Sequence, residues 1–443
     1  MLPDNAERDS LSLAKEKHYT IVILLLCVIP MLSLMAAAIY SEHDFMSNSE
    51  MRWVNTFFLL VPLLLLVING WIVLALYAFA STLFFFKTLL TMGAISNSTL
   101  NMMALILGGA FFIRRRSIHS VPGLIPYLLL LSLIFVQFFR TEEIIAGINV
   151  VLGAVTIGLF FYVIAPRLHV GEAIFMLKAY LLGFVLFGLF LLLSYDWGVG
   201  ARMGESLGLD ANNVGLFAAS ASVISLYLHL DKRLSLWWGS WPFVIASILL
   251  VLSSSRSFII VTVIGLLLLF GKKNFALKGA ISLGVLMVVI FTAISYYFDS
   301  DIARHLTRGV ESDTDVELES VSALRWYLLQ AGIELFTEKP FLGFGVANFA
   351  DAAGISAYEG GQNLVAHNIY LSSAVELGVV GLILLLIWNG RCLWEGYRSG
   401  AVFGVTITIM YCLVGLLSGN YLDVEYAFIW GVAFVVAATP PQR

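Results

Sequence analysis

Long apolar runs recur along the whole chain and constrain its fold more than any other feature. We count twelve to fourteen of them, and several reach the roughly 20 residues that a helix needs to cross the hydrocarbon core of a bilayer. Because lipid offers backbone groups no hydrogen-bond partners, we expect an all-α fold, a polytopic bundle of transmembrane helices. The predicted spans are 19–40, 53–68, 71–90, 98–113, 121–139, 144–164, 173–195, 214–230, 236–254, 257–270, 276–298, 369–388, 402–419 and 426–439.

The composition excludes three other classes of protein. Of the 443 residues, 60% are apolar and 12% are charged, a charged share about half that of soluble domains. A soluble enzyme and a disordered protein are therefore excluded. The net charge of −4 provides no basic surface for nucleic acid. The 3 cysteines are too few and too scattered for a disulfide framework or a zinc site.

Lysine and arginine in the loops predict the orientation of the bundle. With the N-terminus in the cytoplasm, the inner segments carry more of these residues than the outer ones, including Arg114–Arg116 and Lys272–Lys273. The polar start of the chain leads into a full-length apolar run without a small-residue cleavage site, so we expect no cleaved signal peptide. In this orientation one long hydrophilic segment, residues 299–368, lies outside. We expect the protein to carry out its function on this outer face.

The long outer segment separates two membrane parts. We predict a bundle with an N-terminal cytoplasmic tail over residues 1–298, a periplasmic loop over 299–368 and C-terminal membrane helices over 369–443. Within the loop, Leu324, Leu328, Ile333 and Leu335 recur with near-helical spacing. This periodicity predicts an amphipathic helix in the stretch 321–336.

Two arginines are candidates for binding an anion. Arg256 lies among serines between two apolar runs, where a guanidinium costs free energy unless it is paired or hydrated. Its fork could bind phosphate oxygens, or it could extend to lipid headgroups. Arg202 precedes a polar stretch in which Asp210 or Asn212 could cap a helix that starts near Val214. That stretch could be a simple turn, or Arg202 could be a second phosphate ligand.

His367 and Arg325 are the candidates from the outer segment. His367 lies where the segment returns to the membrane, and imidazole can accept a proton near neutral pH. It could equally be hydrogen-bonded to loop backbone in a structural role. Arg325 precedes the turn 338–345, in which Gly343 and Gly345 permit backbone conformations closed to other residues.

Other candidate residues support different chemistry. Asp313 and Asp315 form a DxD pattern that could hold a divalent metal beside a diphosphate, although runs of acids are usually solvated. Activity that survives chelation would eliminate that interpretation. Lys178 lies within a predicted span. The chain has no phosphate-binding loop, zinc-protease or nucleophile-elbow motif.

The order and spacing of these motifs resemble the bacterial O-antigen ligase and polymerase superfamily. The similar parts are Arg202 before Asn212-Asn213, Ser255-Arg256-Ser257, Arg325-Trp326, Pro340-x-x-Gly343-x-Gly345, and Ala366-His367-Asn368-x-Tyr370-Leu371 followed by Glu376-x-Gly378 and Gly381. They cover roughly residues 200–385. Asn212-Asn213 stands where many members have Pro-Asn.

The resemblance implies a GT-C-like membrane glycosyltransferase of the bacterial inner membrane. It would be metal-independent and inverting, without a cofactor, and would take a glycan from undecaprenyl diphosphate at the periplasmic face. The acceptor would be lipid A–core for a ligase or a growing lipid-linked chain for a polymerase, with a chain-length regulator as a possible partner. By the resemblance, Arg202 and Arg256 bind the diphosphate, Arg325 is a further ligand, and His367 is the base or orients the acceptor.

A transporter or flippase of lipid-linked glycan is the alternative. The number of spans and Lys178 favour it. A transporter needs a polar path through the midplane, yet ionisable residues within the spans are nearly limited to Lys178 and Glu376.

Overall fold

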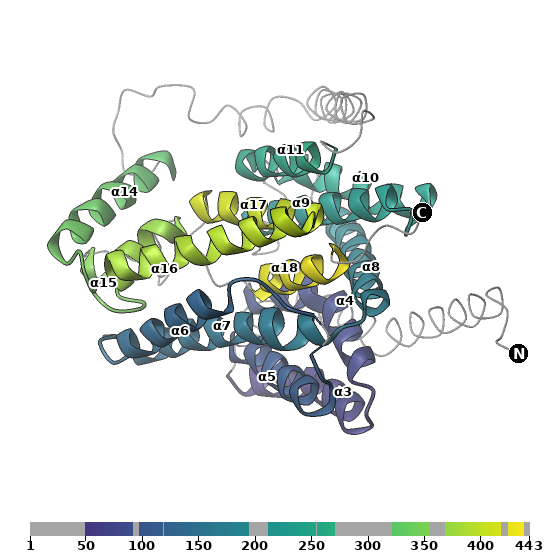
Figure 1. Cartoon of the computed structure of the whole chain (residues 1–443), viewed down its shortest axis with the longest axis horizontal. Helices are drawn as coiled ribbons and strands as arrows, with labels where there is room; N and C mark the ends of the chain where they lie inside the picture. Colours follow the sequence, from purple (N-terminus) through teal and green to yellow (C-terminus); the bar gives the residue numbers. More distant parts are fainter. Residues whose placement is uncertain are drawn as a thin grey trace, which may run out of the picture. The chain divides into compact units, whose positions relative to one another are not determined.

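The computed structural model describes residues 49–91, 97–117, 119–194, 211–253, 255–270, 321–353, 368–417 and 424–437. All regular structure in these ranges is helical, and they contain no strand (Figure 1). Each predicted span that falls within them coincides with a helix, and the spans predicted at 19–40 and 276–298 lie outside. The expected all-α membrane fold is confirmed.

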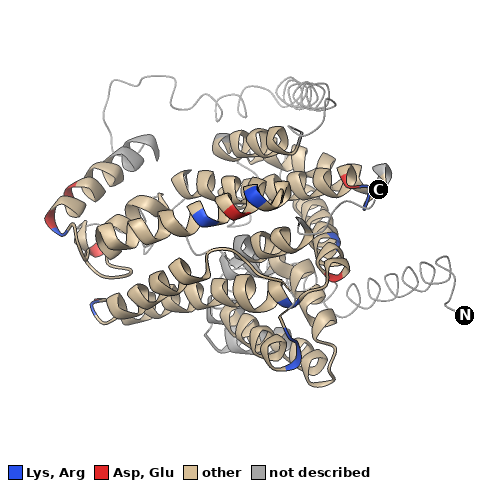
Figure 2. Cartoon of the chain, in the orientation of Figure 1, with Lys and Arg blue, Asp and Glu red and all other residues tan. Residues whose placement is uncertain are grey.

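Several of the described helices can cross a bilayer. Four are long and apolar enough by length and composition alone: Ile144–Arg167, Val170–Ser194, Ala211–Leu230 and Ile369–Ser399, the last of which is interrupted at Gly378. Six shorter apolar helices of 10–17 residues accompany them in the described ranges. Figure 2 shows that few residues of the described helices are charged. This is the pattern of a multi-pass membrane protein.

The chain divides into two compact units, and the first comprises residues 1–116 and 167–255. Its helix α8 packs against α4, α9 and α10, and α3 packs against α4 and α5. The helices are α3 (Ser49–Ile68), α4 (Ile72–Thr91), α5 (Asn97–Arg114), α8 (Val170–Ser194), α9 (Ala211–Leu230) and α10 (Leu236–Leu252).

A small residue and large rings together determine how α4 meets α8. A Cβ on Gly183 would lie 1.9 Å from the backbone oxygen of Ser81, so only glycine permits this approach. Beside it, the buried ring of Phe84 lies 4.5 Å from Tyr180 and 4.9 Å from Phe217 on α9. Aromatic pairs at such distances favour a fixed packing, so the helices have one close arrangement.

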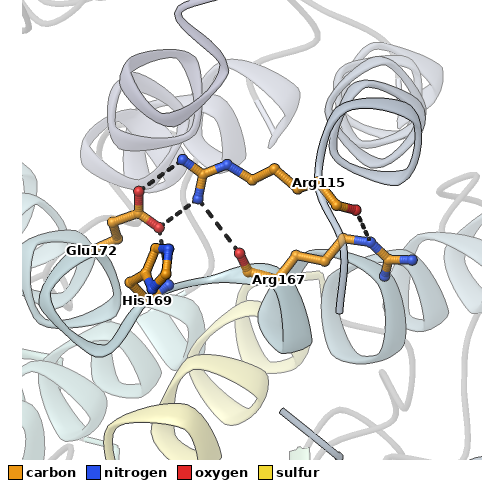
Figure 3. A network of polar contacts seen from close by, with 4 residues as sticks. All are labelled: Arg115, Arg167, His169 and Glu172. Carbon is orange, nitrogen blue, oxygen red and sulfur yellow. Dashed lines mark hydrogen bonds and ion pairs between the residues drawn. The ribbon is translucent and has the colours of Figure 1, made fainter. Parts of the chain in front are cut away.

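A polar network joins the end of α5 to the start of α8 (Figure 3). The Arg115 guanidinium donates to both carboxylate oxygens of Glu172, at 2.6 and 2.9 Å, and Nε of Arg167 donates to the backbone oxygen of Arg115. Glu172 also accepts from the backbone N–H of His169. A bidentate pair of this kind orients both side chains and holds the two helix ends together.

The second unit comprises residues 117–166 and 256–443. Its central helix α16 packs against α6, α14 and α17, and α17 also contacts α11 and α18. The helices are α6 (Leu124–Phe138), α7 (Ile144–Gly158), η3 (Leu159–Ile164), α11 (Arg256–Phe270), α14 (Val321–Glu338), α15 (Phe349–Ala352), α16 (Ile369–Ser399), α17 (Val402–Leu417) and α18 (Val424–Ala437), and the short η4 (Ala165–Arg167) follows η3 across the sequence boundary between the units.

An aromatic cluster forms the core of this second unit. The Trp430 ring lies 4.6 Å from Tyr411, 4.9 Å from Phe161 and 5.0 Å from Trp388. The indole N–H of Trp430 donates to the hydroxyl of Thr408, so its polar atom is paired inside the core. The cluster joins α16, α17 and α18 to η3.

The amphipathic helix predicted at 321–336 is confirmed as α14. Leu328 and Leu335 are buried against Phe349 and Val375, whereas Ile333 is exposed. The apolar face of α14 therefore packs on α15 and α16. The predicted division at residues 298 and 368 stays a prediction.

Candidate functional site

Some of the site residues predicted from the sequence lie outside the described residues, and the others lie at or near the start of a described helix. Arg202 and His367 lie outside the described residues, as do Asp313 and Asp315. Arg256 is the first residue of α11, and Arg325 lies in α14. The described surroundings of these positions therefore define the candidate site.

One hydrogen bond joins two of the sequence motifs. The buried hydroxyl of Ser255 donates to Oδ1 of Asn212 at 3.1 Å. Asn212 is the second residue of α9, which begins at Ala211 rather than near Val214, so Asn212 belongs to the first turn and not to the cap. Arg256 follows Ser255 directly in the chain. The bond therefore fixes the position of the residue that precedes Arg256.

Asn368 determines where α16 begins. Its side chain accepts hydrogen bonds from the backbone N–H groups of Tyr370 and Leu371, at 3.0 and 3.1 Å. These N–H groups have no acceptor within the helix, so the asparagine is an N-cap. His367 immediately precedes this cap in the sequence.

We predict that Asn368→Ala lowers the free energy of unfolding by about 1 kcal/mol, because two N–H groups lose their acceptor. Asn368→Asp retains an acceptor at the same place and should keep most of the stability. Denaturation of both purified variants in detergent measures the difference. Equal stability of the two variants would argue against the cap.

Helix α16 is sharply interrupted at Gly378, where the sequence predicts one continuous span. Gly378 has φ 71° and ψ −171°, a conformation outside any helix. Nδ2 of Asn389 lies 3.5 Å from the hydroxyl of Tyr370, although a straight helix would separate these residues by about 28 Å. The segments 369–377 and 379–399 therefore fold back beside each other. The start of the first segment lies beside the middle of the second.

The turn after α14 is locked onto this interruption. The backbone N–H of Phe344 donates to the oxygen of Val375, that of Gly345 to Glu376, and that of Val379 to Pro340, at 2.7–2.9 Å. These backbone bonds join the predicted Pro340-x-x-Gly343-x-Gly345 and Glu376-x-Gly378 motifs.

Glycine is required on both sides of this contact. A Cβ on Gly343 would lie 2.5 Å from the backbone of Glu376, and one on Gly378 would lie 2.1 Å from the backbone oxygen of Phe341. Both residues also have positive φ. The two motifs are therefore parts of one backbone-to-backbone contact.

Asn348 extends the contact to the end of α6. Its buried side chain donates to the backbone oxygens of Arg140 and Phe344 and accepts from the N–H of Glu142, at 2.9–3.0 Å. The hydroxyl of Thr141 donates to the oxygen of Val346 at 2.7 Å. The sequence offers one signal for Asn348, which is its place after the glycine turn.

Buried polar groups lie on both segments of α16. Glu376 is only 6% exposed. The hydroxyls of Ser372 and Ser373 and Oδ1 of Asn389 are buried without a hydrogen-bond partner among the described residues. Ser373 also borders a small cavity with Tyr127 and Trp388. Such groups are costly to bury in an apolar bundle.

The comparison with known proteins finds one similar family. No curated relative matches the chain. Residues 241–386 match a family model described as O-antigen ligase. The match spans Arg256, Arg325, the glycine turn, His367 and the Gly378 interruption, and it supports the resemblance of the chain to the O-antigen ligase and polymerase superfamily.

Proposed function

We propose that the protein transfers a glycan from undecaprenyl diphosphate to a sugar hydroxyl at the periplasmic face of the inner membrane. The family match over residues 241–386 carries this proposal, because it includes three of the four predicted site residues. The acceptor is lipid A–core or a growing lipid-linked chain. The orientation with a cytoplasmic N-terminus is part of the proposal.

The proposed chemistry requires neutralisation of growing negative charge. A glycosyl diphosphate already carries a good leaving group, and its charge rises as the anomeric bond breaks. Arg202 and Arg256 bind the diphosphate, with Arg325 as a further ligand. Guanidiniums held in place before the reaction stabilise the transition state, and loss of one such donor costs about 10²–10³ in rate. No metal ion or cofactor takes part.

The position of Arg256 supports its role as an anion ligand. It is the first residue of α11, where the helix carries a partial positive charge. A cation there gains nothing from the helix, and a nearby anion stabilises it. Ser255, which precedes it, is held by Asn212. A diphosphate would offset both positive charges.

His367 provides the acceptor step. As a base it takes the proton of the attacking hydroxyl, and as an orienting group it holds that hydroxyl toward the anomeric carbon. Asn368, the residue after His367, is held in place as the N-cap of α16.

We predict that Arg256→Lys lowers turnover by about 10²–10³, nearly as much as Arg256→Ala, because an ammonium cannot bind two oxygens in a fork. Arg116→Lys is the matched control, since Arg116 is exposed and is not one of the candidate site residues. Initial rates with a lipid-diphosphate glycan measure the effect. Ordinary turnover by Arg256→Lys would contradict the diphosphate role.

The proposed function is tested with purified protein and a lipid-linked repeat unit. A ladder of products from the repeat unit alone identifies a polymerase, and a product formed only after addition of lipid A–core identifies a ligase. Movement of the lipid-linked glycan across vesicles without a new glycosidic bond would overturn the proposal in favour of a transporter.

A further inference from the structure

The turn between α14 and α15 presents two large apolar side chains outward. Phe341 is 73% exposed and Leu342 is 56% exposed. The backbone beneath them is fixed, because Gly343 donates to the oxygen of Lys339 and Phe344 donates to that of Val375. The exposure is therefore a property of an ordered turn.

This apolar pair is continuous with the outer surface of α6. Nε2 of Gln137 and Nη1 of Arg140 both donate to the backbone oxygen of Leu342, at 2.8 and 3.2 Å. Around these residues, Val136 is 60% exposed and Phe139 is 74% exposed. The turn and the end of α6 thus form one apolar surface, which we call the α6–turn patch: Phe135, Val136, Phe139, Phe341 and Leu342.

The length of α6 is compatible with a position of this patch at the depth of lipid. Its 15 residues extend about 22 Å, less than the roughly 30 Å of the hydrocarbon core. An upright α6 therefore ends inside or at the border of the core. Apolar side chains packed beside its end continue the lipid-facing surface outward.

Cations lie at the border of the patch. Arg140 is exposed just beyond α6, and Nζ of Lys339 lies 4.0 Å from the centre of the Phe344 ring. Long basic side chains at this level reach the phosphates of lipid headgroups while their stems stay on apolar surface. Charge and apolar area together match a phospholipid leaflet.

We propose that Phe341 and Leu342 insert into the phospholipid leaflet and anchor the glycine turn at the membrane surface. The anchor would hold the interruption at Gly378 at the boundary between lipid and water, since the turn is hydrogen-bonded to it. Lipid contact at this turn does not depend on which reaction the protein catalyses.

The first test measures depth in a bilayer. A nitroxide is attached at Phe341→Cys, in a chain whose three native cysteines are replaced, and the protein is reconstituted in phospholipid vesicles. We expect oxygen to relax this label several-fold more effectively than a water-soluble nickel chelate. The matched position, Glu338→Cys, is exposed at the end of α14 and should favour the chelate. Equal chelate access at both positions would overturn the proposal.

The second test leaves the native cysteines in place. Para-benzoylphenylalanine replaces Phe341, and the reconstituted protein is illuminated and analysed by mass spectrometry. Adducts with lipid acyl chains at position 341, and none at position 338, are expected. Adducts with protein in place of lipid would overturn the proposal, because they would identify a second copy or another protein as the occupant.

Discussion

Replacing His367 with alanine is expected to lower glycan transfer by about 10²–10⁴-fold, because the attacking hydroxyl loses its base or its orienting partner. The variant should remain inserted and folded. Initial rates of the purified protein with a lipid-diphosphate glycan measure the loss. The effect should fall on turnover more than on donor affinity, since in the proposed function the arginines bind the diphosphate.

His169→Ala is the matched control for this experiment. His169 is exposed at the start of α8, and the bond that orders this region uses its backbone N–H and not its ring (Figure 3). Its replacement should leave transfer unchanged. Transfer by His367→Ala at the rate of His169→Ala would reject the assigned role.

The largest effect on stability is expected for Gly378→Ala. The added Cβ would lie 2.1 Å from the backbone oxygen of Phe341, and no flexible side chain can move aside to relieve it. The backbone conformation, φ 71° and ψ −171°, adds strain of about 1–3 kcal/mol for any other residue. A marked fall in the midpoint of thermal unfolding in detergent should follow, together with loss of the turn.

Gly390→Ala provides the control on the same helix. A Cβ there meets no atom within 4 Å, and alanine favours a helix over glycine by about 1 kcal/mol. Its midpoint should stay the same or rise slightly. If Gly378→Ala and Gly390→Ala unfold at the same temperature, the contact between the turn and Gly378 does not hold the site together.

The helices follow from the sequence because their signals are local. Apolar runs predict the spans, and the spacing of Leu328 and Leu335 predicts the buried face of α14. Both patterns lie within one segment, so they can be recognised without knowing which other segment packs against it.

The interruption of α16 could not be predicted in the same way. The residues around Gly378 are as apolar as an ordinary span, and the reason for the glycine lies in the backbone of Phe341, far away in the sequence. The sequence does contain Gly343, Gly345 and Gly378, but it does not indicate that they belong to one contact.

In the candidate site, too, some features could be predicted from the sequence and others depend on the fold. Residue type is enough to select Arg256 and His367 as groups that could bind phosphate or move a proton. Their supports, Asn212 beneath Ser255 and the cap at Asn368, involve single polar contacts. Asn368 stands before an apolar run, a pattern that indicates a helix N-cap. The pairing of Ser255 with Asn212, in contrast, depends on the fold.

The central claim is that Arg202, Arg256 and His367 act on one lipid-linked diphosphate. A cryo-electron microscopy structure with a non-transferable undecaprenyl-diphosphate glycan tests it most directly. We expect both guanidiniums within hydrogen-bonding distance of the diphosphate oxygens and the imidazole beside the anomeric carbon. A diphosphate bound away from these arginines, or His367 on the opposite side of the membrane, would contradict the claim.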